Sequence, residues 1–323
     1  MIDPNLIDKK NWDEHYIKRG NPSKPTYYII RRRANAVGLF SHFITVAGHI
    51  RRAFLNGWIP VVDMQNYSNP YLAPEKLGKE NSWEYYFEQP LRIGLEEAYN
   101  SENVVLSSGV PVARPQWRGM NIYDNKNVGL AHWRALVKFG ILRVKESLHQ
   151  EILEERKKLF APNDRVLGVL LRGTDYVALK PNNHPIPPSP EFVIDFIVKK
   201  IRLWKCNKIF LATEDKSIVQ HFKDTFGDGF GDFCKILNRE YVDYTESATG
   251  VSVIRIDREN DHFLQGKDYL TQIVILSTCK SFVTARCSGA AGVMLLGEHF
   301  ENTFAFDLGV YGVRPVDWKK LLG

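Results

Sequence analysis

The sequence has little of what marks a disulfide-stabilised, metal-binding or membrane-spanning protein. Its 323 residues include only four cysteines, without a CxxC pair or Cys/His spacing typical of a metal site. Scattered cysteines are typical of reduced thiols. No stretch approaches the roughly 18 consecutive apolar residues of a membrane span, and the polar start from Met1 to Asn5 lacks the apolar core of a signal peptide. We therefore expect a cytoplasmic protein.

The net charge of the sequence is positive. Lysine and arginine outnumber the acids, giving a formal net charge of +6 and an isoelectric point near 9.0. Such a surface suits a nucleoside diphosphate, or an anionic membrane that carries a lipid-linked acceptor. Nucleic acid would fit the charge equally, but no nucleic-acid-binding motif is present. We expect no nucleic-acid partner.

The length predicts two domains of ordinary size. A charged helical pattern over 145–160 is followed by Ala161-Pro162-Asn163-Asp164, which is typical of a linker. We place the boundary there, giving an N-terminal domain of 1–160 and a C-terminal domain of 161–323.

The N-terminal half opens with a βαβ pattern. A β-rich run over 26–31 precedes a helical pattern over 40–55, which stops at Asn56-Gly57, and a second β-run covers 58–63. Beyond Asp63 the sequence becomes irregular and rich in aromatic residues.

The C-terminal half alternates apolar strands with amphipathic helices. Expected strands cover 166–171, 208–213 and 281–285; expected helices begin at Ser189-Pro190 and cover 217–226, 269–276 and 290–296. This order predicts a doubly wound parallel sheet.

Polar clusters follow three of these strands directly. Ligands bind beyond the carboxyl ends of parallel strands, where helix N-termini converge. The clusters are Arg172 to Asp175, Thr213-Glu214-Asp215, and Arg286-Cys287-Ser288-Gly289. A guanidinium, small turn residues and a carboxylate together suit a nucleoside diphosphate. Each cluster also has a structural interpretation: an arginine ion pair, a helix cap and a tightly packed turn, respectively.

The segment from Val169 to Val177, VLLRGTDYV, resembles the first donor-site motif of the fucosyltransferase superfamily, which includes α1,2-, α1,6- and protein O-fucosyltransferases. In the α1,2 members that motif reads approximately VHVRRGDYV. The chain retains Arg172, Asp175 and Tyr176, whereas Leu170 replaces the histidine and Gly173 replaces the second arginine. The family's arginine role therefore falls on Arg172 alone.

Two further segments are similar to the same family. Residues 38–43, GLFSHF, resemble the loop that opens the first long helix, with Ser41 and His42 in place of asparagine and glutamine. Residues 281–288 resemble the late strand and turn that hold the pyrophosphate. The donor-binding residues expected from motifs and strand ends together are Gly38, Ser41, His42, Arg172, Thr213, Glu214, Asp215, Arg286, Cys287, Ser288 and Gly289.

The resemblance implies a GT-B-type α/β architecture, in which two Rossmann-like domains face each other across a cleft. The first domain would bind the acceptor and the second the donor. It also implies inverting transfer of fucose from GDP-β-L-fucose to a glycan or lipid-linked oligosaccharide, without a cofactor or an essential metal. Peripheral contact with the inner face of a membrane is compatible with such an acceptor. Two alternatives remain: the same fold with another GDP- or UDP-activated sugar, and a non-catalytic basic protein that binds glycan or nucleic acid.

The expected catalytic residues follow from the charge changes of glycosyl transfer. Arg172 would stabilise the negative charge that grows on the leaving diphosphate. Asp63, Asp175 and Glu240 are candidates for activating the acceptor hydroxyl, and His42 is a further catalytic candidate. The run from Arg31 to Arg33 is typical of a solvated charge cluster. The proline-rich segment around His184 is expected to be a stiff spacer, with a wall of the donor pocket as the alternative.

Overall fold

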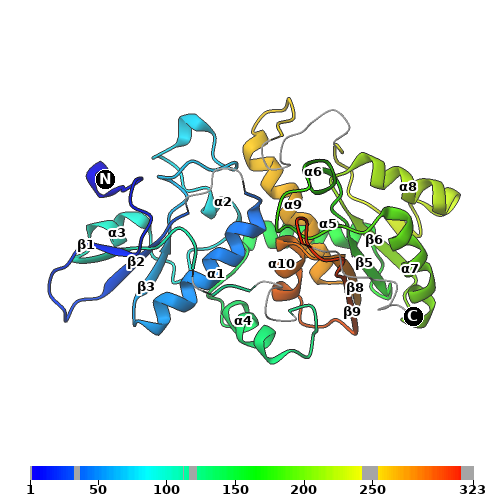
Figure 1. Ribbon diagram of the computed structural model, residues 1–323, viewed down its shortest axis with the longest axis horizontal. Coiled ribbons are helices and arrows are strands. Elements are labelled where there is room, and N and C mark those ends of the chain that lie inside the picture. Colours follow the sequence, from blue (N-terminus) through cyan, green and yellow to red (C-terminus); the bar gives the residue numbers. More distant parts are fainter. Residues whose placement is uncertain (1, 33–36, 112, 116–121, 242–253, 314–323) are drawn as a thin grey trace. The chain divides into compact units, whose positions relative to one another are not determined.

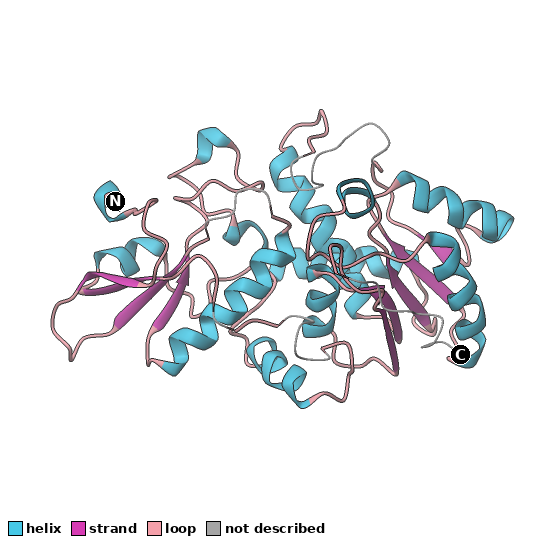
Figure 2. Ribbon diagram, in the orientation of Figure 1, coloured by secondary structure: helices cyan, strands magenta, loops and turns pink. Residues whose placement is uncertain are grey.

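The structure is a computed structural model that describes residues 2–32, 37–111, 113–115, 122–241 and 254–313. The chain forms two compact units, each built around its own sheet (Figures 1 and 2). Unit 1 comprises Met1–Gln116, Ala131–Gln150 and Arg255–Leu270, and unit 2 the remaining segments. The predicted α/β class with parallel sheets is confirmed. A cleft between two facing domains, and a single boundary near residue 160, stay predictions.

The sheet of unit 1 has four strands in the order β1-β4-β2-β3. The strands are β1 (His15–Lys18), β2 (Thr26–Ile30), β3 (Ile59–Val62) and β4 (Asn103–Leu106). The pairs β2–β3 and β2–β4 are parallel, and β1 joins the edge antiparallel to β4. The predicted βαβ unit is therefore present, with α1 (Leu39–Leu55) as its crossover.

Both faces of this sheet are covered because successive side chains of a strand point to opposite sides. Tyr27 and Ile29 of β2 pack with Leu95 and Tyr99 of α3 (Leu95–Asn100). Tyr28 lies between them on the opposite side, where its hydroxyl is 3.0 Å from His49 Nδ1 of α1. Helix α1 thus lies on one face of β2 and α3 on the other.

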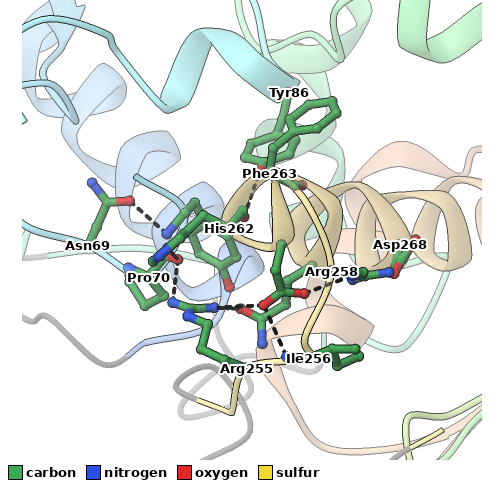
Figure 3. A network of polar contacts seen from close by, with 12 residues as sticks. Asn69, Pro70, Tyr86, Arg255, Ile256, Arg258, His262, Phe263 and Asp268 are labelled. Atoms are coloured by element: carbon green, nitrogen blue, oxygen red, sulfur yellow. Dashed lines mark hydrogen bonds and ion pairs between the residues drawn. The ribbon is translucent and has the colours of Figure 1, made fainter. Parts of the chain in front are cut away.

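A late segment of the chain completes unit 1. It comprises Arg255–Leu270, including the first turns of α9 (Asp261–Ser277), and it contacts the irregular aromatic region that contains α2 (Trp83–Tyr86) (Figure 3). The Tyr86 hydroxyl donates to the Phe263 carbonyl at 2.9 Å, and the two rings stack 9° from parallel. The Arg255 guanidinium donates to the Pro70 carbonyl at 2.6 Å. The aromatic region therefore serves as the docking surface for this segment.

Unit 2 is a doubly wound domain around an all-parallel sheet, β7-β6-β5-β8-β9. Numbered from its first strand, the order is 3-2-1-4-5, that of a dinucleotide-binding domain. The strands are β5 (Val166–Leu170), β6 (Lys208–Ala212), β7 (Cys234–Lys235), β8 (Ser281–Ala285) and β9 (Asn302–Phe306). The predicted doubly wound sheet is confirmed.

Helices pack on both faces of this sheet. On one face the core includes Val193 and Ile197 of α7 (Pro190–Leu203) and Phe222 of α8 (Lys216–Phe226). On the other face, Gly168 of β5 allows close packing, since a Cβ there would lie 2.8 Å from Leu276 Cδ2 of α9. The remaining helices are α4 (Val128–Lys138), α5 (Glu146–Leu159), α6 (Thr174–Leu179) and α10 (Ser288–Leu296).

No described helix is a candidate membrane span. None of them combines the length and the apolar character that crossing a bilayer requires.

The contact between Gly266 and Tyr86 yields a stability prediction. A Cβ at Gly266 would lie 2.4 Å from the Tyr86 ring, and Tyr86 is fully buried. Gly266→Ala should therefore lower the free energy of unfolding by about 1–3 kcal/mol, as overpacking does. Gly229→Ala is the control, because the nearest atom to a Cβ there is 3.9 Å away. Equal midpoints for the two variants in urea denaturation would contradict the prediction.

Candidate functional site

The candidate site of unit 2 lies at the point where the strand order reverses. The neighbours β5 and β8 are parallel, and the chain proceeds from β5 toward β6 on one side and from β8 toward β9 on the other. In open α/β sheets, ligands bind at such a switch point, beyond the carboxyl ends of the strands. The clusters around Arg172 and Arg286 follow these two strands directly.

Arg172 is held by a carboxylate and an aromatic ring. Its side chain is 17% exposed, and its Nε lies 3.5 Å from Glu214 Oε1. The guanidinium carbon stands 4.8 Å from the centroid of the Tyr176 ring. Glu214 is itself only 7% exposed, so this ion pair is shielded from water and fixes one edge of the guanidinium. Two residues of the predicted site, Arg172 and Glu214, are thus brought together.

The structure explains why residue 173 is glycine. A Cβ at Gly173 would lie 2.8 Å from Asp215 Oδ2 and 3.1 Å from Ile218 Cδ1. Asp215 cannot easily retreat, because its Oδ1 caps α8 by accepting from the amide of Ser217 at 2.8 Å. An arginine at position 173, as in the fucosyltransferase motif, would collide with this cap.

The turn after β8 presents a helix N-terminus. Cys287 is the N-cap of α10, and its Sγ accepts from the Ala290 amide at 3.3 Å. Burial raises the pKa of the Cys287 thiol, and the nearby charge of Arg172 partly opposes this rise. Ser288 and Gly289 form the first turn of α10, where backbone N–H groups favour an anion. Arg286 pairs with Asp307 at 2.8 Å.

A cavity of about 10 Å³, room for about one water molecule, lies between these elements. Its lining comes from the ends of β5 and β8, from α6 and from the proline-rich segment, and comprises Leu170, Arg172, Tyr176, Pro185, Pro187, Ala285, Arg286 and Cys287. The Tyr176 ring contacts the His184 ring at a centroid distance of 5.3 Å. Two prolines of the segment around His184, Pro185 and Pro187, line this cavity, and a role of the segment as a wall of the donor pocket stays a prediction. Pro185, Pro187 and Tyr176 are members of the site that the strand-end argument did not include.

Thr213 and Asp215 have structural partners. The Thr213 carbonyl accepts from Gln272 Nε2 at 2.9 Å, and its hydroxyl accepts from the Asp215 amide at 3.1 Å. Asp215 caps α8 through both the amide and the hydroxyl of Ser217. The capping interpretation of this cluster therefore describes Asp215 well, and Glu214 is the residue of the three that faces Arg172. Binding of a donor by Thr213 and Asp215 stays a prediction.

Asp175 lies in α6, directly after Thr174. Its side chain is outside the part of the chain that the structure describes, so its role also stays a prediction.

In unit 1, the predicted loop residues lie at the start of α1. Gly38 is the N-cap and provides no side-chain cap, and its carbonyl accepts from the Ser41 amide at 2.9 Å. His42 is 3% exposed, and its Nε2 is buried without a hydrogen-bond partner. Burial lowers the pKa of His42 well below its usual value, and the charge of Arg32 lowers it further. The imidazole is therefore neutral at pH 7.

Asp63 is surrounded by donors within unit 1. Its Oδ1 accepts from the backbone N–H groups of Gln65 and Asn66. Its Oδ2 accepts from the side-chain Nδ2 of Asn66 and from the Tyr99 hydroxyl, and all four distances are 2.8–3.0 Å. It is 1% exposed, and burial raises its pKa. Both oxygens are thus engaged in holding the turn after β3. This geometry favours a structural role and gives no support to Asp63 as the general base.

The expectation that the run from Arg31 to Arg33 is solvated is wrong for Arg31. This side chain is 1% exposed and donates to the carbonyls of Ser107, Asp8 and Asn11 at 2.6–2.9 Å. It ties the N-terminal segment to the ends of β2 and β4. Arg33 lies outside the described residues.

Within the described residues, no group of three or more His, Cys, Asp or Glu side chains is placed to hold a metal ion.

Position 173 provides a direct test of this site. Gly173→Arg restores the family's second arginine in sequence, yet the Asp215 cap occupies the space that its Cβ needs. We expect a loss of unfolding free energy of about 2 kcal/mol or more and no gain in nucleotide affinity, measured by urea denaturation and calorimetry. Gly229→Ala is a control, as the nearest atom to its Cβ is 3.9 Å away. A stable Gly173→Arg variant would contradict this account.

The buried histidines of α1 predict acid sensitivity. Burial lowers the pKa of His49 to about 3, against about 6.5 in an unfolded chain. The unfolded state therefore binds more protons between these values, and stability present above pH 6.5 is lost as the pH falls. The slope should reach about 1.4 kcal/mol per pH unit for each such histidine. His49→Gln should reduce the slope measured by urea denaturation between pH 4.5 and 6.5; an unchanged slope would refute the assignment.

Comparison with known proteins identifies the fold. No protein-family model matches the sequence, and no curated protein is significantly similar to it in sequence. Among solved structures, the chain is similar to an α-1,6-fucosyltransferase, NodZ, soaked with GDP-fucose: TM-score 0.51 and 12% identity, over 84% of this chain and 93% of that one. A second structure, fucosyltransferase NodZ from Bradyrhizobium, gives TM-score 0.51 and 13% identity over 91% and 99% of the respective chains.

At such low identity the likeness concerns the fold. It covers most of both chains. The motifs around Arg172, Gly38 and Ser288 predicted a relationship to the fucosyltransferases. That prediction is confirmed at the level of the fold. The chain has the fold of the NodZ fucosyltransferases.

Proposed function

We propose that this protein is a glycosyltransferase that moves fucose from GDP-β-L-fucose to an acceptor hydroxyl, with inversion at the sugar carbon and without an essential metal. The observation that carries the proposal is the convergence of Arg172, Arg286 and the N-terminal turn of α10 at the strand switch point. The fold shared with NodZ, whose structures include GDP-fucose and GDP complexes, supports the choice of donor.

The chemistry of the leaving group explains this set of residues. As the glycosyl bond breaks, negative charge develops on the diphosphate, and fixed positive groups lower the energy of that state. Arg172 would supply a guanidinium already oriented by Glu214 and Tyr176. The first turn of α10, with Ser288 and Gly289, would supply backbone N–H groups. These groups are held in place before the donor binds, which limits the cost of reorganisation.

The acceptor hydroxyl must lose a proton during transfer. His42 is neutral and its Nε2 has no partner, so it is chemically able to accept one. Asp175 is the second candidate, from its place in the motif. Asp63 is the weakest, because four hydrogen bonds already occupy its carboxylate.

The acceptor is proposed to be a glycan or a lipid-linked oligosaccharide. The net positive charge supports an anionic partner, including the inner face of a membrane at which a cytoplasmic enzyme would meet such an acceptor.

The role of Arg172 can be tested by substitution. Arg172→Ala should reduce GDP-fucose turnover by about 10²–10³-fold, the usual effect of removing a donor to a developing charge. Arg202→Ala is the matched control, since Arg202 is exposed on α7 of the same unit. Because Arg172→Ala leaves Glu214 without this partner, Arg172→Lys should be measured beside it. Equal GDP affinity and turnover in the parent and all three variants would refute the proposed site.

The donor can be identified separately by calorimetry. GDP and GDP-fucose should bind, whereas UDP and UDP-sugars should bind at least about tenfold more weakly, a difference of about 1.4 kcal/mol. Preference for GDP-mannose or a UDP-sugar would keep the site and change the sugar. Binding of oligonucleotides with a steep salt dependence, and no response to any nucleotide sugar, would instead favour a non-catalytic basic protein.

A further inference from the structure

A surface patch of unit 1 combines exposed apolar side chains with arginines. It lies at the turn that joins the end of α1 to the start of β3 (Figure 1), and it includes residues from the end of β1. We call it the arginine–aromatic patch. Its members are Tyr16, Arg19, Arg51, Arg52, Phe54, Leu55 and Trp58.

The turn holds two large apolar side chains in water. Phe54 is 42% exposed and Leu55 is 67% exposed. The turn itself is tight, since the Trp58 amide donates to the Ala53 carbonyl at 2.9 Å and the Gly57 amide to the Phe54 carbonyl at 3.1 Å. Gly57 has a φ of +68°, which glycine adopts without strain. The backbone therefore fixes Phe54 and Leu55 in exposed positions, where a covering layer would remove apolar surface from water.

Cations and aromatic rings alternate beside this turn. The Arg19 guanidinium carbon lies 4.1 Å from the centroid of the Tyr16 ring, and the Tyr16 ring meets the Trp58 ring edge-on at 6.2 Å. The Arg52 guanidinium carbon lies 5.8 Å from the Trp58 ring, and the buried Tyr28 ring stacks on Trp58 at 5.3 Å. The rings are thus held in place. Tryptophan, tyrosine and arginine are the residues that proteins place at the boundary between a membrane and water.

Positive side chains outnumber negative ones in and around the patch. The cations are Lys18, Arg19, Arg51 and Arg52, and the carboxylates among them are Glu14 and Glu102. Glu14 pairs with Arg52 at 2.8 Å, and Glu102 accepts from the Asn21 amide at 3.4 Å. Arg19 and Arg51 are exposed. The excess of positive charge favours an anionic partner.

The charge and the apolar turn together select the kind of partner. A second copy of this chain, related by two-fold symmetry, would place the same arginines opposite one another. A nucleic acid would pair with the arginines through its phosphates, but it offers no apolar layer for Phe54 and Leu55. An anionic bilayer meets both requirements, because its headgroups attract arginine and its acyl boundary receives apolar side chains.

We propose that the arginine–aromatic patch binds the surface of a membrane that contains anionic lipid. Phe54 and Leu55 enter the boundary between headgroups and acyl chains, and the arginines contact lipid phosphates. Trp58 precedes β3, so the patch lies at the amino ends of the parallel strands β2 and β3. The membrane therefore leaves free their carboxyl ends, where such sheets bind ligands. The inference gives a defined surface to the membrane contact of the proposed function and is independent of the chemistry at Arg172.

Co-sedimentation with lipid vesicles tests the proposal. Vesicles of equal parts phosphatidylcholine and phosphatidylglycerol should bind the parent protein at least about tenfold more tightly than vesicles of phosphatidylcholine alone. Added salt should weaken binding to the mixed vesicles, because it screens exposed charges. Equal binding to the two kinds of vesicle, or binding to neither, would overturn the proposal.

Substitutions on α1 locate the contact. Leu55→Ser should weaken binding to the mixed vesicles by about tenfold, as expected for the loss of one buried apolar side chain. Leu203→Ser is the matched control, because Leu203 also ends its helix, α7, and is 68% exposed. Arg51→Gln should weaken binding about fivefold, with Arg202→Gln on α7 as its control. Parent-like binding by both Leu55→Ser and Arg51→Gln would contradict the assignment.

Sedimentation velocity without lipid tests the alternative occupant. The parent should remain monomeric at the concentrations used for co-sedimentation. A dimer that Leu55→Ser dissociates would overturn the proposal, since a second copy would then cover the patch.

The failure of this inference can be distinguished from the failure of the proposed function. Arg172→Ala should bind the mixed vesicles as the parent does, and Leu55→Ser should turn over GDP-fucose with a water-soluble acceptor as the parent does. A parent that turns over GDP-fucose without binding the vesicles would refute the surface alone. A parent that binds the vesicles but no nucleotide sugar would support the surface and refute the proposed function.

Discussion

The contact between Gly173 and Asp215 is the constraint on which the candidate donor site depends. Asp215 caps α8, and its other carboxylate oxygen lies where a side chain at position 173 would begin. The turn after β5 therefore packs directly on the turn after β6. This arrangement brings Glu214 to the Nε edge of Arg172 and sets the guanidinium over Tyr176. Gly173 replaces the second arginine of the motif, and the packing around it requires a residue without a side chain at this position.

Much of unit 2 could be predicted because its signals are local. The buried strand from Val166 has no polar residue, and Ser189-Pro190 marks the start of α7 with a cap that the structure confirms. The observed strand order places Arg172 beside the turn at Arg286. Helix α9 was expected from 269 and begins at Asp261; its first turns carry Asp261 and Asp268, which both pair with Arg258 before the helix. These turns therefore lack the helical spacing of apolar residues from which a helix is predicted.

The unpredicted features are those that arise from distant residues. The wall formed by Pro185 and Pro187 depends on a loop returning to the end of β8. Asp63 follows a strand as a catalytic carboxylate would, but Tyr99, 36 positions later, helps to occupy it. Arg31 resembles its neighbour Arg32 in sequence, yet one is fully paired with carbonyl groups and the other has buried unpaired atoms. Periodicity and motif spacing carry no information about such partners.

The docking of Arg255–Leu270 on the aromatic region of unit 1 has a consequence for biosynthesis. The chain leaves the ribosome from its N-terminus, so the sheet of unit 1 emerges long before the segment that covers Tyr86 and Pro70. At ordinary translation rates the interval is on the order of ten seconds, far longer than the folding of a typical small domain. Unit 1 must therefore wait, with its aromatic surface uncovered, until most of unit 2 has been synthesised.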